Sequence, residues 1–239
     1  MVCSVSFFQE GLRLFRMKHR GAKNLIITIL CQLSLLIFGI LIPKITISNL
    51  GSEANGFLST INEVFVYMSL LEGGLGLALL NSLYELITKN EMDQVSDVMT
   101  AAEIKYKKIA VVYLLVTIGI AFAFPLFLRS KLSYPEMVMT ITLQGIGGAG
   151  SMYLSASVSQ YLIASGRNYV REINHLFNYI IASISKILFI FLTKNIVVVT
   201  LVQTLFYLLE AFIYRYYFKK NLTKVNLKSK TPKIGRAHV

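Results

Sequence analysis

The sequence contains few of the residues that soluble proteins use to cover their surface. Of its 239 residues only 15% are charged, just 12 are acidic, tryptophan is absent, and 55% are hydrophobic. So much apolar side chain exceeds what the core of a soluble protein of this length can hold. The composition therefore predicts a protein whose apolar surface faces lipid.

Cysteine and histidine are too scarce for several kinds of functional site. Cys3 lies in the N-terminal segment and Cys31 in a hydrophobic run, so they cannot form a disulfide framework and we interpret both as structural. His19 and His175 show no metal-ligand spacing, and the sequence has no phosphate-cradling P-loop. We therefore expect no catalytic residue, no cofactor and no metal site, and so no enzyme.

Long hydrophobic segments predict six membrane-spanning helices. Crossing the ~30 Å hydrocarbon layer takes about 20 apolar residues, and three uncharged runs reach that length, at 24–43, 109–128 and 137–166. Three further segments are as long but carry ionisable residues. The predicted fold class is all-α integral membrane, with spans at about 25–43, 57–84, 109–128, 137–164, 173–193 and 195–214.

The segments between the spans give further expectations. Pro43 and Lys44 together should end the first helix, because proline removes a backbone donor and clashes with the preceding turn. Residues 91–108 have acidic side chains in their first turn and lysines at their end, which is typical of a separate amphipathic helix lying on the membrane surface. The membrane unit is thus predicted to cover 25–218, after a cytoplasmic tail at 1–24.

The distribution of basic residues predicts the orientation. The net charge of +12 could suggest a nucleic-acid partner, but 18 lysines and arginines fall in the N-terminal tail and every second connection, against four in the alternate connections. Basic residues accumulate on the cytoplasmic side of membrane proteins. Both termini of a multi-pass membrane protein are therefore expected in the cytoplasm, with no nucleic-acid partner.

Glycines at 145–150 satisfy the spacing of a dinucleotide-binding fingerprint. That motif requires a strand before it and the start of a helix after it, whereas this one lies within a 30-residue uncharged run. Small residues within a membrane span allow helices to pack closely. We therefore interpret these glycines as a packing surface.

Polar residues recur at helical spacing on one face of several spans. Gln144 belongs to such a stripe in the fourth span, Asn178 to one in the fifth, and Gln203, Tyr207 and Glu210 to one in the sixth. A single polar residue usually makes an ordinary interhelical hydrogen bond, but repetition across spans makes a shared water-filled cavity equally plausible. The stripes thus favour transport.

Ionisable residues within the spans are candidates for function, because a charge at the bilayer centre costs at least ~2.5 kcal/mol. Glu72 is too deep for its side chain to reach either interface, whereas Glu63, nine residues earlier, falls on the opposite face. Lys186 either binds a ligand or extends toward the outer interface. Glu210 is expected to pair with Arg215 or another neighbour.

The C-terminal end has an unusual origin. Residues 234–239 match one reading frame of a ligation adapter used in DNA sequencing, and we interpret them as an artefact. Residues 219–233 would then be a cytoplasmic linker to a second lobe that the sequence does not contain.

Four segments carry a resemblance to a known family. They are 50–56 (LGSEANG), 71–76 (LEGGLG), 81–84 (NSLY) and 161–169 (YLIASGRNY). In this order they resemble the polysaccharide flippases of the multidrug/oligosaccharidyl-lipid/polysaccharide exporter superfamily. The resemblance covers about residues 17–233 and implies the N-terminal lobe of a two-lobe transporter in a bacterial plasma membrane.

The resemblance implies a function and a tentative binding site. Such proteins move undecaprenyl-pyrophosphate-linked oligosaccharides to the outer leaflet by alternating access, alongside polymerases and glycosyltransferases, and their cationic cavities hold the phosphates. Lys186 and Lys44, with Arg167 and Arg171 at the cytoplasmic entrance, are the cations available. The candidate substrate-binding set is Glu72, Lys186, Lys44, Arg167, Arg171, Gln144 and Asn178.

Two other functions remain open at this point. A cation-coupled multidrug exporter of the same superfamily would use Glu72 as a proton or sodium site. A membrane scaffold in a cell-envelope assembly complex would transport nothing, and it predicts tightly packed helices without a central cavity.

Overall fold

Six helices make up the regular structure of the described residues. The computed structural model describes the backbone of residues 3–128 and 131–221, and the side chains from Ile26 onward apart from those at 71 and 73. The helices are α1 (Cys3–Leu50), α2 (Ser52–Thr88), α3 (Met92–Phe127), α4 (Tyr134–Ala164), α5 (Asn168–Thr193) and α6 (Ile196–Asn221). Within those ranges there is no strand, so the all-α expectation is confirmed. Most of the predicted linker at 219–233, and the adapter-like residues 234–239, lie outside the described residues.

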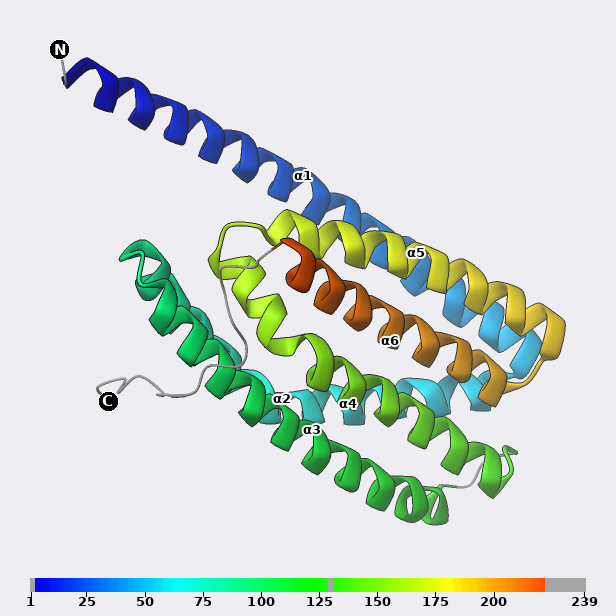
Figure 1. Cartoon of the computed structure of the whole chain (residues 1–239). Coiled ribbons are helices and arrows are strands. Elements are labelled where there is room, and N and C mark those ends of the chain that lie inside the picture. Colours follow the sequence, from blue (N-terminus) through cyan, green and yellow to red (C-terminus); the bar gives the residue numbers. More distant parts are fainter. Residues whose placement is uncertain (1–2, 129–130, 222–239) are drawn as a thin grey trace.

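The helices pack in a closed order around the bundle. Going round, α1 contacts α5, α5 contacts α6, α6 contacts α4, α4 contacts α3, α3 contacts α2, and α2 returns to α1. Helix α4 also touches α2 and α5 and is therefore the most enclosed helix (Figure 1). We call the end of the bundle with the α2–α3 and α4–α5 turns the basic end, and α6 also finishes there (Figure 1).

Two helix boundaries differ from the sequence expectation. Pro43 lies inside α1, which continues to Leu50, so the expectation that Pro43 and Lys44 end the helix was wrong. Proline removes only one backbone donor, and the helix continues with Thr46 Oγ1 donating to the carbonyl of Ile42 at 2.7 Å. Residues 92–108 are not a separate helix either, but the first half of α3, because nothing at Lys108 interrupts the backbone.

Four helices are long and apolar enough to cross a membrane. They are Ile26–Leu50 of α1 together with α3, α5 and α6, and α2 becomes a fifth if its two halves, which meet at a 48° bend, form one span. Helix α4 is not among them, because polar and small residues occupy much of its length and lower its mean hydropathy. The described residues thus contain four or five candidate spans, which identifies a multi-pass membrane protein.

Apolar side chains cover the outside of the bundle. Leu36 and Ile40 on α1, Leu115 on α3 and Leu188 on α5 are all more than half exposed. Exposed apolar surface on this scale is not found on soluble monomers. A lipid environment accounts for it, since the hydrocarbon layer solvates such side chains at no cost.

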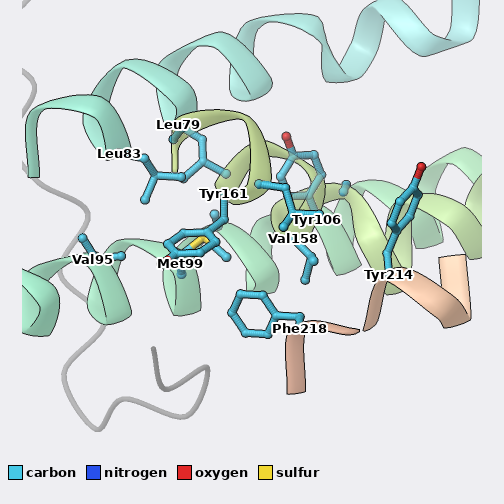
Figure 2. Packing of buried hydrophobic residues seen from close by; sticks show 13 residues of the cluster. Leu79, Leu83, Val95, Met99, Tyr106, Val158, Tyr161, Tyr214 and Phe218 are labelled. Carbon is cyan, nitrogen blue, oxygen red and sulfur yellow. The ribbon is translucent and has the colours of Figure 1, made fainter. Parts of the chain in front are cut away.

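The inner faces are packed at both ends. At the basic end, Leu83 of α2, Met99 and Tyr106 of α3, Val158 of α4 and Phe218 of α6 belong to one buried cluster (Figure 2). A second cluster at the opposite end joins the starts of α2, α4 and α6 to the end of α3. These clusters hold α2, α3, α4 and α6 together, and a third, with Tyr113 and Met152, packs α2, α3 and α4 between them.

Glycines on α4 let α3 and α6 approach closely. A Cβ on Gly145 would lie 2.0 Å from Thr117 Cγ2, one on Gly148 would lie 2.8 Å from the Tyr113 hydroxyl, and one on Gly150 would lie 2.3 Å from a methyl of Leu208. All of these glycines are within a continuous helix. The structure therefore agrees with a packing surface and provides no dinucleotide-binding turn.

Replacing Gly145 with alanine should destabilise the bundle. The new methyl meets Thr117, which is fully buried and held by a 2.9 Å bond to the Tyr113 carbonyl. Overpacking costs about 1–3 kcal/mol, more than the ~1 kcal/mol that alanine gains as a helix former. Gly119→Ala is the matched control, because nothing lies within 4 Å of its Cβ position. Thermal unfolding in detergent should show a lower midpoint for Gly145→Ala alone; equal midpoints for the two variants would refute the packing role.

Candidate substrate cavities

Two cavities with polar side chains in their lining lie between the helices of the bundle. The larger, about 500 Å³, which we call the vestibule, is lined by α1, α2, α4, α5 and α6 with Gln32, Glu72, Ser159 and Arg171 among its residues. The smaller, about 240 Å³, which we call the inner cavity, is lined by α1, α2, α5 and α6. The vestibule lies toward the basic end, since it reaches the first residues of α5. The vestibule and the inner cavity are neighbours along the length of the bundle.

Helical periodicity explains why polar side chains gather there. Ser151, Ser155 and Ser159 are spaced by four residues, so they form one polar line on α4 that faces the vestibule. On α6 the residues from Gln203 to Tyr214 follow the same rule, and the line passes from the inner cavity into the vestibule. The sequence stripes thus correspond to real polar surfaces inside the bundle.

A carboxylate with three partners lies where the cavities meet. Glu210 Oε1 is 3.0 Å from His175 Nδ1 and accepts a 2.9 Å bond from the Tyr214 hydroxyl, while its Oε2 accepts a 3.0 Å bond from the Asn178 amide. Glu210 and His175 line both cavities. Such bonding stabilises a carboxylate away from bulk water, and it ties α5 to α6 at the boundary.

The remaining charges of the vestibule are only partly paired. Arg171 forms an ion pair with Glu172, its neighbour in sequence. The Glu172 carbonyl also accepts a bond from the thiol of Cys31, at 3.4 Å, which attaches α1 to α5. Glu72 brings a third carboxylate to this cavity. The vestibule therefore contains three carboxylates against one arginine and one histidine.

The inner cavity has a different electrostatic character. Lys186 Nζ donates to the Gln203 side-chain oxygen at 2.9 Å, and the Gln203 amide donates to the Tyr207 hydroxyl at 3.0 Å. The lining also includes the amides of Asn62 and Asn178, several aromatic rings, and the shared pair of Glu210 and His175. Lys186 forms no ion pair among the described residues. It therefore offers an uncompensated positive charge to a ligand.

The structure divides the seven predicted site residues into three groups. Glu72 and Arg171 line the vestibule, and Lys186 and Asn178 line the inner cavity. Gln144 lines neither, but donates to Asn62 Oδ1, which does line the inner cavity.

Lys44 and Arg167 form the third group, since neither lines these cavities and no described hydrogen bond joins either side chain to a lining residue, as one joins Gln144 to Asn62. Lys44 is an exposed residue of α1 beyond Pro43, and Arg167 caps the start of α5. Both lie near the ends of the bundle and outside the two cavities.

Sequence reasoning missed the ion pairs that organise the site. Glu210 was expected to pair with Arg215 or another neighbour, and its partner is His175. Arg215 instead pairs with Glu103 of α3 at 2.6 Å, and Glu103 also meets Lys107 at 2.7 Å. The only available signal was that Glu210 shares a helical face with Tyr207 and Tyr214, because contacts between α3, α5 and α6 depend on how the helices pack.

Comparison with known proteins identifies no relative: no protein-family model matches the chain, and neither the curated proteins nor the solved structures provide a match. The description of the site therefore depends on its geometry alone.

Cysteine labelling should distinguish a water-filled vestibule from a lipid-facing surface. In a background with Cys3 and Cys31 replaced by alanine, we expect Ser159→Cys to react with a charged methanethiosulfonate and Leu115→Cys to remain unmodified. The reagent requires thiolate, which forms in water and not in hydrocarbon, although Leu115 is the more exposed of the two in the structure. Mass spectrometry after labelling in membranes measures both rates. Faster labelling at Leu115 would contradict the assignment of the two surfaces.

Proposed function

We propose that the chain is the first lobe of a membrane flippase for undecaprenyl-pyrophosphate-linked oligosaccharide, acting in cell-surface polysaccharide biosynthesis. The observation that carries this proposal is the pair of adjoining cavities, each with charged and polar side chains in its lining, within a bundle whose exterior is apolar. Such a bundle offers a polar headgroup a path shielded from hydrocarbon, while the lipid tail stays in the bilayer. Alternating access would come from movement of this lobe against a second one.

Lys186 is the residue we assign to the substrate's pyrophosphate. A pyrophosphate in a medium of low dielectric needs a compensating charge, and Lys186 is the inner cavity's cation without a carboxylate partner among the described residues. Arg171 is neutralised by Glu172, so it contributes less. Arg167 and Lys44 are assigned to the two entrances.

Helix α4 is the sixth span in this proposal. Its low hydropathy follows from its position, because a helix in contact with four others shows little surface to lipid and can carry serine, glycine and glutamine. With six spans, the asymmetry of basic residues supports a cytoplasmic location for both termini and the basic end, in a protein of the bacterial plasma membrane. The vestibule would then open toward the cytoplasmic leaflet, where lipid-linked precursors are made.

The cavities help to distinguish a flippase from the two alternatives, a membrane scaffold and a multidrug exporter. A scaffold was expected to have tightly packed helices without a central cavity, and volumes of about 500 and 240 Å³ favour a transporter instead. A multidrug exporter would recognise organic cations, which the unpaired Lys186 repels. The inner cavity thus favours an anionic headgroup.

Removing the charge of Lys186 should weaken binding of the proposed substrate. Charge-assisted hydrogen bonds contribute about 1.5–3 kcal/mol, so Lys186→Met should lower the affinity of the purified chain for undecaprenyl pyrophosphate about tenfold or more. Native mass spectrometry in detergent or nanodiscs measures this. Lys194→Met is the control, since Lys194 is exposed in the α5–α6 turn.

Two results would contradict the proposal. One is equal binding by the two variants, which would remove Lys186 from the site. The other is tighter binding of a lipophilic organic cation than of undecaprenyl pyrophosphate by the unmodified chain, which would favour the exporter.

A further inference from the structure

The vestibule is lined by polar side chains that the protein itself leaves unused. Gln32 of α1, Glu72 of α2, and Ser159 and Gln160 of α4 all line it, and none of them has a side-chain hydrogen bond or ion pair within the described residues. An amide or a hydroxyl both donates and accepts, whereas an ionised carboxylate accepts only. The vestibule therefore offers donors and acceptors to a ligand with several hydroxyl groups.

Glu72 and Gln160 adjoin each other on the α2–α4 side of the vestibule. The Gln160 amide nitrogen lies 3.1 Å from the Cβ position of Gly76, and Gly76 is one turn of α2 from Glu72. Residues four apart on a helix have Cβ positions about 5–6 Å from each other. The amide donor and the carboxylate acceptor can therefore both reach one ligand of the size of a sugar ring.

Size and charge together divide the proposed headgroup between the two cavities. Small-molecule pockets typically measure about 300–1,000 Å³. The vestibule, at about 500 Å³, falls within this range, and the inner cavity, at about 240 Å³, falls below it. Lys186 gives the inner cavity the positive charge that a pyrophosphate needs. The smaller cavity thus suits the pyrophosphate, which leaves the vestibule for the sugar.

The charge of the vestibule limits which sugars it can accept. Arg171 is already paired with Glu172, and His175 with Glu210, so the described lining keeps no cation for a carboxylate on the ligand. Glu72 adds a third carboxylate to the same cavity. A carboxylate on the sugar would meet this excess of negative charge in a medium of low dielectric, where like charges repel strongly.

We propose that the vestibule is a subsite for neutral or amino sugars and that it rejects acidic sugars such as uronic acids. This inference rests on the proposed function, since it assigns the sugar of the same lipid-linked substrate. Glu72 and Gln160 bind groups of the sugar ring, and the charge of Glu72 sets the selectivity. Specificity commonly depends on such a repulsive element as well as on attractive contacts.

Native mass spectrometry of the full chain in nanodiscs tests the selectivity with three lipids that share undecaprenyl pyrophosphate. One carries no sugar, one carries N-acetylglucosamine, and one carries N-acetylglucosaminuronic acid, which differs from the second by a carboxylate. The N-acetylglucosamine lipid should bind about tenfold or more tightly than the acidic lipid, because only the acidic sugar is repelled in the vestibule.

Variants of two carboxylates on α2 assign the selectivity to a residue. Glu72→Gln should reduce the ratio of the two affinities by strengthening binding of the acidic lipid, because glutamine removes the repelling charge and can still form hydrogen bonds. A loss of structure would instead weaken binding of both lipids. Glu63→Gln, which changes an exposed carboxylate on the same helix, should leave the ratio unchanged.

The lipid without sugar separates failure of the sugar subsite from failure of the flippase. If that lipid binds, but the acidic lipid binds as tightly as the N-acetylglucosamine lipid or Glu72→Gln keeps the original ratio, the selectivity is refuted and the flippase is not. If none of the three lipids binds, the flippase proposal is refuted, and the sugar subsite with it.

Discussion

The outer surface of the bundle is apolar and requires an apolar medium. That medium limits where the polar side chains of the bundle can lie and which partners they can bind. A hydrocarbon layer offers no hydrogen bonds, so polar side chains must turn inward and find partners there. The arrangement of Glu210 with His175, Tyr214 and Asn178 is a direct result, since it satisfies a carboxylate far from either end of its helix. The interior of the protein is polar because its exterior cannot be.

This constraint gives α4 two roles, in helix packing and in lining the vestibule. Its glycines allow close contact with α3 and α6, and its serines supply one wall of the vestibule. A helix that other helices surround does not need the hydropathy of a lipid-facing span. This explains why α4 is less hydrophobic in composition than its neighbours. Close packing on one face and a cavity on another are thus produced by the same small residues.

Periodicity and composition predicted much of the fold, because both follow from local rules. Uncharged runs located the helices, and the stripe through Tyr207 and Glu210 identified a cavity-facing surface before any contact was known. Continuation of α1 through Pro43 was not predictable, because the cost of one lost hydrogen bond is small within a long helix. Pairs such as Glu103 with Arg215, which lie 112 residues apart, depend on tertiary packing and leave no periodic signal.

The central claim is that all six helices cross a bilayer, with their polar cavities inside. Alkaline phosphatase fused after Gly166 or after Lys194 tests it most directly, because the enzyme requires disulfides that form outside the cytoplasm. The account predicts an inactive fusion at Gly166 and an active one at Lys194. An active fusion at Gly166 with an inactive one at Lys194 would mean that one of the helices before Gly166 does not cross the membrane or that the orientation is reversed, and would contradict the account.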